Sequence, residues 1–402
     1  MKILKQNSGV IRPILTGTLG GIVLASTFIM GFVVRGYFPE PVQGVTVALD
    51  ESGYPLVDEV QGILDRIYLR EQPDYVTRQY GAVRGLLTTL DDPNTFFIEP
   101  PVAQSEAHVL AGTYGGIGVL VNRNEAGEFI IYPIEDSPAA EAGILDGAIL
   151  LEINGNPVTL ETPPDAVDQL MRGEVIDDNG VELTIEQDGE ELTLYIVFDV
   201  INIPSVVWRV LEEDNRIGYV QILRFTSRTP EELQTGLTEL NEANIEALVI
   251  DMRNNSGGLL SESIDVANEF VDNGVIIYEV TQSDEHTFNA DQGGLAAELP
   301  LVVLVNGGTA SAAELVSGAI RDNERGILIG QATFGKGTVQ QIFTLSDGSS
   351  IHVTSAEWLT PNRTPIASVG LIPDIEMIPD ANGRDVEIGE AIRYLQQQLE
   401  TE

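Results

Sequence analysis

The chain has 402 residues, 43% of them hydrophobic, which is enough for two or three domains. Its 62 acidic residues outnumber the 21 lysines and arginines, and the formal net charge of −41 argues against nucleic acid as a partner. Because the sequence has no cysteine, disulfides, thiolate catalysis and cysteine metal sites are excluded. We expect neither a metal nor a cofactor.

The first 35 residues predict a membrane anchor. Lys2, Lys5 and Arg12 precede an uncharged, mostly apolar run at 13–34, which is long enough to span a bilayer as a helix. Because the positive charges precede the apolar run, the N-terminus is predicted to lie in the cytoplasm and the residues after the run outside it. The protein would then be a single-pass protein of the cell membrane. The alternative is a cleaved signal peptide, which would make the protein secreted.

Residues 36–102 predict a linker followed by a small helical region. Pro39 and Pro41 mark the linker, and a helical spacing of apolar residues begins near Leu56. The acidic turn at 90–95 closes this region. We interpret the turn as the start of a loop and assign it no chemical role.

Residues 103–200 predict a β-rich domain with a peptide-binding edge. Glycines in the run 114–119 would let backbone N–H groups converge on a peptide carboxylate, while an extended tail adds to the edge of the sheet. A short helix, a turn and a strand follow between 137 and 153, and a helix over 165–171 would line the groove. This order of elements resembles a PDZ domain, and the resemblance implies Gly116, Ile117, Gly118, Val119 and Arg172 as peptide-binding residues, although Arg172 could equally be an ordinary surface arginine.

Residues 201–402 predict an α/β layer, because strands and helices alternate up to about residue 330. The apolar runs 217–222, 247–251 and 301–305 are typical of buried strands. A glycine-rich loop follows the second run. Two more strands and a final helix capped by Asp385 complete the chain.

Ser311 is the candidate nucleophile. It lies where the apolar run at 301–305 hands over to a helix, next to backbone N–H groups that would stabilise an oxyanion. The alternative is that Ser311 only caps this helix.

A serine nucleophile needs a base, and Lys336 is the candidate. The histidines at 108, 286 and 352 lie in no context that suggests a triad, and Lys336 is the only lysine after the leader. A desolvated lysine can lose its proton near neutral pH, whereas an arginine cannot.

The segment 330–337 is one residue short of a phosphate-binding P-loop. Gly337 stands where the magnesium-binding serine or threonine belongs, and the residues that follow are typical of a strand, not of the required helix. Nucleotide binding is therefore disfavoured.

Two runs, 309–314 and 334–340, resemble the nucleophile and lysine motifs of the carboxyl-terminal processing peptidases. This family consists of serine peptidases with a Ser/Lys dyad and a PDZ domain, and the segments at 114–119 and 137–155 are similar to a PDZ domain. Trp358 departs from the aromatic pair that is commoner in the family. The roles that the resemblance implies are the nucleophile Ser311, the general base Lys336, the lysine-orienting Gln340, the oxyanion hole of Gly257 and Ala312, and structural support from Asp322.

The expected fold is an α+β multidomain chain. It would comprise an N-terminal membrane anchor (1–35), a linker with a small helical region (36–102), a PDZ β-barrel-like domain (103–200) and an α/β peptidase core with a C-terminal helix (201–402).

The expected activity is cleavage of protein substrates near their C-termini, with the free tail held by the PDZ domain. A homo-oligomer or an activating partner is compatible with this activity. The alternatives are a catalytically silent PDZ scaffold that only binds peptides, and a serine hydrolase of small molecules.

Overall fold

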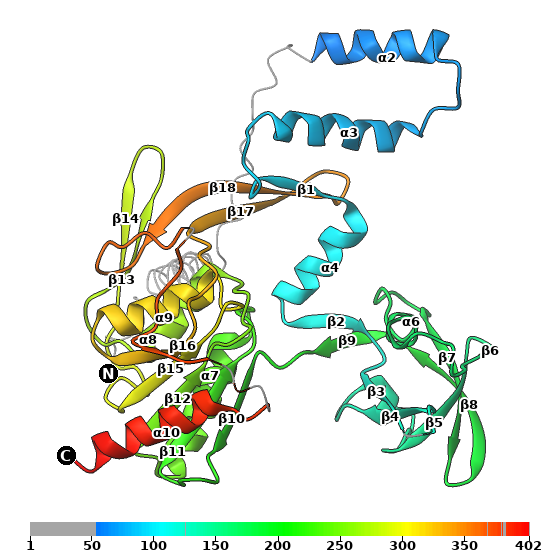
Figure 1. Ribbon diagram of the computed structural model, residues 1–402. Coiled ribbons are helices and arrows are strands. Elements are labelled where there is room, and N and C mark those ends of the chain that lie inside the picture. The colour runs from blue at the N-terminus through cyan, green and yellow to red at the C-terminus, as the bar shows by residue number, and fades with distance from the viewer. Residues whose placement is uncertain (1–53, 125, 368, 379, 381–382, 402) are drawn as a thin grey trace, which may run out of the picture. The chain divides into compact units, whose positions relative to one another are not determined.

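The computed structural model describes residues 54–124, 126–367, 369–378, 380 and 383–401 (Figure 1). The expected membrane anchor and residues 36–53 of the expected linker lie outside these ranges. Within them, none of the helices combines the length and apolar content needed to cross a bilayer. The described residues also contain no cluster of histidine and acidic side chains that could hold a metal ion.

The described residues up to Tyr75 and those from Val76 onward belong to two compact units. The first contains helix α2 (Pro55–Ile67), and α3 (Tyr75–Thr88) leads into the second. Both helices lie in the stretch that the sequence predicts to be helical. Strand β1 (Phe96–Ile98) and helix α4 (Pro100–Leu110) follow, and the expected boundary between residues 102 and 103 falls inside α4.

A β-rich region lies between two strands that pair antiparallel, β2 (Thr113–Gly116) and β9 (Asp199–Asn202). An antiparallel sheet between them has the order β3-β4-β5-β7-β8, with β6 paired to β5. Its strands and helices are β3 (Val119–Arg123), β4 (Phe129–Pro133), α5 (Pro138–Glu141), β5 (Ala148–Ile153), β6 (Asn156–Pro157), α6 (Pro164–Leu170), β7 (Gly180–Gln187) and β8 (Glu190–Val197). Both helices expected in this region are present, and the sheet and α6 share one buried core.

The C-terminal half is built on a six-stranded sheet of order β10-β11-β12-β15-β16-β19. β10 is antiparallel to β11, and all the other neighbours are parallel. The strands are β10 (Val206–Val210), β11 (Ile217–Ile222), β12 (Ala247–Asp251), β15 (Leu301–Val305), β16 (Gly326–Gly330) and β19 (Ile375–Glu376). The three apolar runs predicted as strands are thus β11, β12 and β15.

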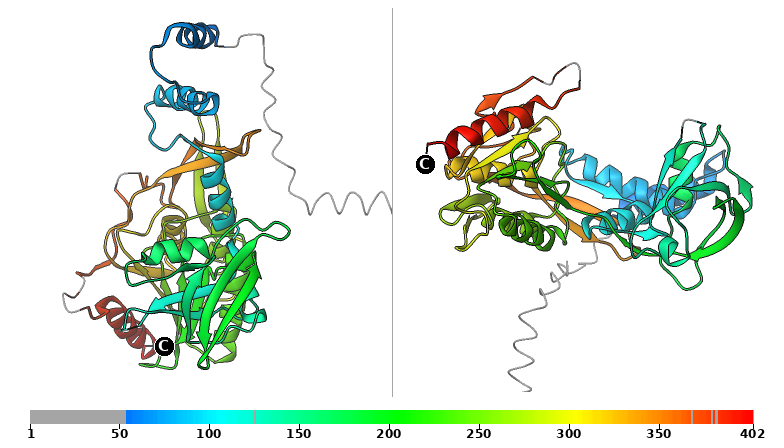
Figure 2. Two further views of the ribbon diagram at one scale, coloured as in Figure 1. Left: turned by 90° about the vertical axis from the view of Figure 1, so that its right-hand side faces the viewer. Right: turned by 90° about the horizontal axis from the view of Figure 1, so that it is seen from below.

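Helices cover both faces of this sheet (Figures 1 and 2). One face packs against α7 (Thr229–Glu242), α8 (Leu260–Asn268) and α9 (Ala312–Asp322), and the other against α10 (Val386–Leu399). Successive strand residues point to opposite faces, so Val303 of β15 joins the first core and Val302 the second. Burial on both faces explains why the strands are continuous apolar runs.

A second sheet lies beside this core, in the order β1-β18-β13-β14, with β17 also paired to β18. Its other strands are β13 (Val275–Val280), β14 (Glu285–Asn289), β17 (Thr338–Thr344) and β18 (Ser350–Leu359). β1 pairs with β18 through Phe97 and Ile351. The segment around residue 95 is therefore fixed beside the hairpin that follows Lys336.

Candidate active site

Three loops leave the same edge of the six-stranded sheet. β12 leads into the loop of Gly257, β15 into the turn before Ser311, and β16 into the loop of Lys336. These strands are parallel neighbours, so their carboxyl ends lie at one edge. Residues that are far apart in the sequence therefore gather there.

Ser311 occupies the N-cap position of α9 in a strained backbone conformation. Its φ is 56° and its ψ is −121°, which a residue with a side chain rarely adopts. The next residue, Ala312, opens the helix, where N–H groups have no intrahelical partner. Among the described residues, the Ala312 N–H donates no hydrogen bond.

Glu314, in the first turn of α9, joins the loops of Ser311 and Lys336. Its fully buried carboxylate accepts from the backbone N–H groups of Ser311 at 2.9 Å, Gly335 at 2.7 Å and Lys336 at 2.9 Å. The Thr333 hydroxyl donates to the same carboxylate. A buried carboxylate needs such donors, and here they fix the main chain of the lysine loop against the serine loop.

Lys336 is held by both its main chain and its side chain. Its Nζ donates to Oε1 of Gln340 at 2.8 Å, and its carbonyl accepts from the indole N–H of Trp358 at 3.1 Å. Burial lowers the pKa of Lys336, and the negative charge of Glu106 opposes this shift. The lysine is therefore shifted toward the neutral amine.

Gln340 is held in turn by the acidic turn at 91–95. Its Nε2 donates to the carbonyl of Asn94. The Asp92 carboxylate shapes the turn, because it accepts from the Asn94 N–H at 2.9 Å and from the Thr95 hydroxyl at 2.6 Å. The Thr95 bond, with a smaller contribution from Asn94, holds the pKa of Asp92 below its usual range. The turn adds no catalytic group, yet the sequence interpretation missed its contact with Gln340.

Gly257 approaches Ser311 so closely that only glycine fits. A Cβ at this position would lie 2.8 Å from the Cβ of Ser311, and φ is 98°. The Gly257 N–H, expected to be an oxyanion donor, instead donates to Oδ1 of Asn255 at 2.8 Å. Of the expected oxyanion pair, the donor without a partner among the described residues is the N–H of Ala312.

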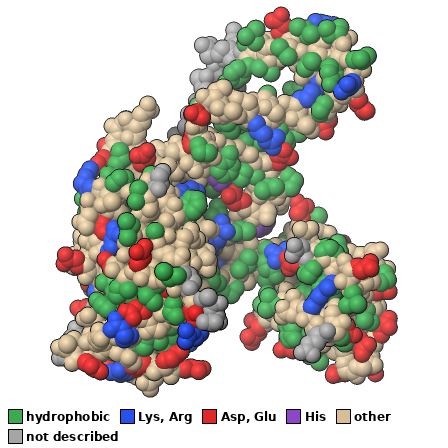
Figure 3. Space-filling model, in the orientation of Figure 1, with side chains coloured by type: hydrophobic (Ala, Val, Ile, Leu, Met, Phe, Trp, Pro, Cys, Tyr) green, Lys and Arg blue, Asp and Glu red, His purple; other side chains and the backbone are tan. Residues whose placement is uncertain are grey.

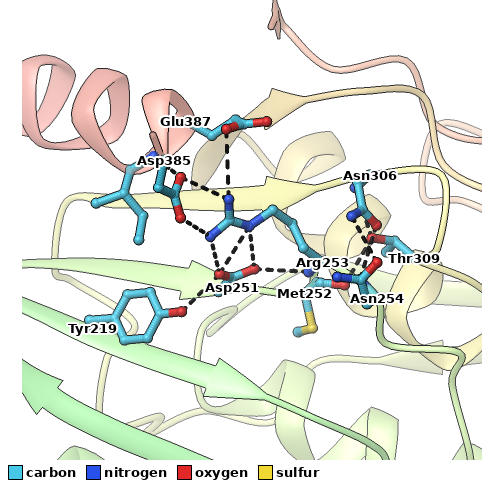
Figure 4. A network of polar contacts seen from close by, with 10 residues as sticks. Tyr219, Asp251, Met252, Arg253, Asn254, Asn306, Thr309, Asp385 and Glu387 are labelled. Atoms are coloured by element: carbon cyan, nitrogen blue, oxygen red, sulfur yellow. Dashed lines mark hydrogen bonds and ion pairs between the residues drawn. The ribbon is translucent and has the colours of Figure 1, made fainter. Parts of the chain in front are cut away.

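The Gly257 and Ser311 loops are fixed to each other (Figure 4). The Asn254 N–H donates to Oδ1 of Asn306 at 2.9 Å, and the Asn306 amide donates back to Oδ1 of Asn254 at 3.1 Å. The Thr309 hydroxyl donates to the carbonyl of Met252 at 2.8 Å. A shift of one loop would therefore break contacts with the other.

Arg253 connects the Gly257 loop with helix α10 (Figure 4). Its guanidinium pairs with Asp251 at 2.6 Å and with Asp385 at 2.7 Å, and the Tyr219 hydroxyl also donates to Asp251 at 2.8 Å. Burial alone would lower the pKa of Arg253, but the two carboxylates outweigh it and raise that pKa. Asp385 accepts from the Ile388 N–H at 3.0 Å, which confirms it as the cap of α10.

Ser311, Ala312, Lys336 and Gln340 line one cavity of about 380 Å³. Helix α4 contributes Glu106 to its wall, and Oε2 of this glutamate lies 2.8 Å from Nε2 of His352. The nucleophile and base candidates thus share a cavity with a carboxylate and an imidazole.

Asp322 does not line this cavity. It lies at the other end of α9, where it pairs with Nε of Arg321 at 2.9 Å and accepts from the Asn362 N–H at 3.2 Å. These contacts favour a structural role.

The candidate peptide-binding residues fall into two groups. Val119 and Arg172 line a groove of about 500 Å³, where the Arg172 guanidinium lies 4.4 Å from the ring centre of Tyr114. Ile117 is fully buried, and its N–H donates to the carbonyl of Met171 at 3.2 Å. A Cβ on Gly118 would lie 2.4 Å from that of Ser137. Because the Ile117 N–H already donates to the Met171 carbonyl, it could bind a substrate carboxylate only after that hydrogen bond breaks.

Models of two known families match the chain. The model of peptidase family S41 matches residues 216–377, and that of the PDZ domain matches residues 129–177. The chain is 32% identical over 378 residues to a carboxy-terminal-processing protease of Bartonella bacilliformis, which covers 90% of this chain and 86% of that protein. The chain belongs to peptidase family S41. It is a serine-type peptidase with a PDZ domain, similar to proteins named carboxyl-terminal-processing proteases.

One further relative and one solved structure are similar to the chain. A carboxyl-terminal-processing protease of Synechocystis is 35% identical over 307 residues, 73% of this chain and 70% of that protein. A solved structure described as an S41 protease of Bacteroides fragilis covers 87% of this chain and 99% of its own, with a TM-score of 0.51 and 15% identity. The second likeness supports the fold alone.

In this S41 peptidase, sequence reasoning missed three side chains that support the site. Glu314 follows Ser311 by three positions, and that serine-to-glutamate spacing is a capping signature that could have revealed it. In the sequence, Trp358 stands out only as a departure from the family pattern, and Glu106 carries no local signal.

Proposed function

We propose that this S41 peptidase is an endopeptidase that cuts protein substrates near their C-termini, with Ser311 as nucleophile and Lys336 as general base. The observation that carries the proposal is their shared cavity, in which burial lowers the pKa of the lysine. A neutral amine can accept the proton of a hydroxyl, whereas an ammonium cannot. Gln340 orients the amine by accepting a hydrogen bond from Nζ.

The reaction follows from these roles in two steps. The Lys336 amine takes the proton of the Ser311 hydroxyl while Oγ attacks the carbonyl carbon of the scissile bond. The ammonium then returns this proton to the leaving nitrogen, and the peptide bond breaks to leave an ester on Ser311. In the second step Lys336 takes a proton from water, hydroxide attacks the ester, and the proton returns to Oγ as the acid product leaves.

The oxyanion of each tetrahedral intermediate needs two donors, for which we propose the N–H groups of Ala312 and Gly257. Ala312 is the first residue of α9, so its N–H has no partner within the helix. The Gly257 N–H can donate to the oxyanion once its hydrogen bond to Asn255 breaks. Asp322 is assigned a supporting structural role.

The groove at Val119 and Arg172 is the proposed site for the substrate tail, with Gly116, Ile117 and Gly118 beside it. An extended peptide would add to the edge of β3, and its end would meet Arg172. Several relatives are named for C-terminal processing, which supports a preference for chain ends.

The proposed domains are those expected from the sequence, at 1–35, 36–102, 103–200 and 201–402, with the second boundary moved to the end of α4 at Leu110. We propose that residues 1–35 anchor the protein in the cell membrane with its catalytic part outside the cytoplasm, on the charge and length of this segment. A homo-oligomer or an activating partner is a further proposal, and solution mass measurements test it.

The deciding experiment incubates the full-length chain with an unstructured protein that ends in an apolar tail, and identifies the fragments by mass. We expect Ser311→Ala to lose at least about 1,000-fold in rate and Lys336→Ala at least about 100-fold, the usual losses for a nucleophile and a general base. Ser283→Ala, in an exposed turn, is the matched control and should cut normally. Cleavage by Ser311→Ala would refute the assignment.

Adding a short ester as a second substrate, and a measurement of tail binding, separates the alternatives. A small-molecule hydrolase would cleave a short ester and leave the protein intact. A silent scaffold would bind the tail and cleave neither substrate.

A further inference from the structure

Arg224 is an unpaired arginine in the wall of the active-site cavity. Among the described residues from Val76 onward, several other arginines pair with carboxylates, as Arg216 does with Asp214 and Arg363 with Glu285. The side chain of Arg224 makes no ion pair or hydrogen bond with the described residues, and its Nε is buried without a partner. In a chain of net charge −41, a cation without a carboxylate is unexpected.

The main chain of Arg224 is fixed against the loop of Gly257. The N–H of the next residue, Phe225, donates to the carbonyl of Gly257 at 3.0 Å, and the Leu259 N–H donates to the carbonyl of Phe225 at 2.9 Å. The Thr229 hydroxyl donates to the carbonyl of Arg224 at 2.9 Å. Arg224 is thus built into the same framework as the residues beside Ser311.

The other charges of the cavity leave Arg224 free to bind an anion. Glu106 lies against His352, and Lys336 donates to Gln340. Lys336 must be neutral to act as a base, so Arg224 is then the one charged lysine or arginine among the described residues that line the cavity.

A buried guanidinium N–H without an acceptor is costly, and a carboxylate satisfies it with two parallel, charge-assisted hydrogen bonds. We propose that Arg224 binds a carboxylate of the substrate close to the scissile bond and thereby sets the cleavage preference. The carboxylate is either an Asp or Glu side chain or the free C-terminus of a substrate cut close to its end. This inference rests on the proposed function, because it places the scissile bond in the cavity of Ser311.

The test uses matched peptides around a cut that the wild-type enzyme has been shown to make. Each residue flanking the cut is replaced in turn by Glu, Gln or Lys, and each peptide is prepared as a C-terminal acid and as an amide. The full-length enzymes are wild type, Arg224→Gln, Arg224→Glu and Ser311→Ala. Arg228→Gln is the matched control, because Arg228 is nearby but pairs with Glu232 instead of lining the cavity.

We expect Arg224→Gln to lower kcat/KM by about tenfold or more for the preferred carboxylate peptide, the usual loss for a charge-assisted hydrogen bond. Its rate on the neutral peptide should stay within about threefold of wild type, which also shows that the variant is folded. Arg224→Glu should reverse the preference toward Lys, and Arg228→Gln should keep the wild-type ratio. If wild type prefers the Glu peptide over the Gln peptide, the ligand of Arg224 is a side-chain carboxylate. If it prefers the C-terminal acid over the C-terminal amide, the ligand is the end of the substrate chain.

The same acid-to-neutral ratio in wild type and Arg224→Gln would overturn the inference while leaving the Ser311 mechanism intact. Cleavage by Ser311→Ala would overturn both the inference and the proposed function.

Discussion

Lys336 can act as a base only while its amine is neutral, so its environment sets the pH range of the enzyme. Burial lowers the pKa of Lys336. We therefore expect kcat/KM to rise with pH through an ionisation below the usual lysine range and to level off above it. Lys336→Arg should lose activity at every pH, because an arginine keeps its proton. Full activity in Lys336→Arg would contradict the mechanism.

The same shift affects stability in a defined direction. The folded protein holds the Lys336 proton less tightly than the unfolded chain does, so the lysine's contribution to the free energy of unfolding falls as pH drops from the usual lysine pKa through the lowered one. Lys336→Met should remove this pH dependence, which denaturant unfolding at several pH values would measure.

Asp92 and Gln340 should affect turnover and leave substrate binding alone. Gln340→Ala removes the acceptor of Nζ, and we expect kcat to fall about tenfold to 100-fold with little change in KM, because the amine loses its orientation. Asp92→Asn loosens the turn that holds Gln340, so a smaller loss in the same direction is expected. Asp91→Asn, at the neighbouring exposed position, is the control. Equal kcat in all three variants and wild type would show that the turn does not position the base.

The elements of the site differ in how far the sequence could reveal them. The strands β12 and β15 are continuous apolar runs, and the loops after them carry the small residues that a close approach requires. Ser311 and Lys336 could therefore be chosen as candidates from the sequence alone. The bond between Gln340 and Asn94 joins residues 246 positions apart, and no local pattern encodes such a contact. The position of Glu106 in the cavity wall is another long-range contact, between α4 and the residues around Lys336, and no local pattern predicts it.

The oxyanion glycine shows a second limit of sequence reasoning. The resemblance implied an oxyanion role for Gly257, and the structure adds the positive φ and the closeness of Ser311 that require a glycine there. Its N–H bond to Asn255 depends on the rotamer of one amide side chain. Composition and spacing do not determine such a choice.

Arg253 forms ion pairs that connect helix α10 with the Gly257 loop. Replacing Arg253 should therefore lower both the stability of the protein and its activity. Arg253→Ala leaves the buried Asp251 carboxylate without its ion pair, and we expect a loss of about 3–5 kcal/mol in the free energy of unfolding. Asp385→Asn keeps an N-cap but removes one charge, and Asp385→Ala should cost about 1 kcal/mol more than Asp385→Asn. Denaturant unfolding measures these differences.

The control for α10 is Arg393→Gln, which breaks an exposed pair with Glu390 on the same helix and should change stability by less than about 0.5 kcal/mol. A loss for Arg253→Ala no larger than this would show that the Arg253 network does not hold the helix.

At the scale of the whole molecule, the charge of −41 should act on substrates before they reach the site. Acidic side chains are spread over the face seen in Figure 3. Between about 10 mM and 150 mM salt, the screening length falls from about 30 Å to about 8 Å. We expect kcat/KM to fall severalfold for a basic unfolded substrate over this range, and to rise for an acidic one.

A small neutral peptide is the control for this effect, because its encounter with the enzyme should not depend on salt. The same salt response for basic and acidic substrates would contradict the prediction. Because the general repulsion of acidic peptides is weakest at the higher salt concentration, the carboxylate preference of Arg224 is best tested there.

Lys336 also makes the enzyme open to selective chemical labelling. The chain contains two other lysines, both within its first five residues, so the rest of it carries a single side-chain primary amine, and that amine lines the cavity. Because its pKa is lowered, it is more nucleophilic near neutral pH than an ordinary surface lysine. An amine-directed reagent small enough to enter the cavity would therefore count active sites, and a substrate segment bound across Ser311 would protect them.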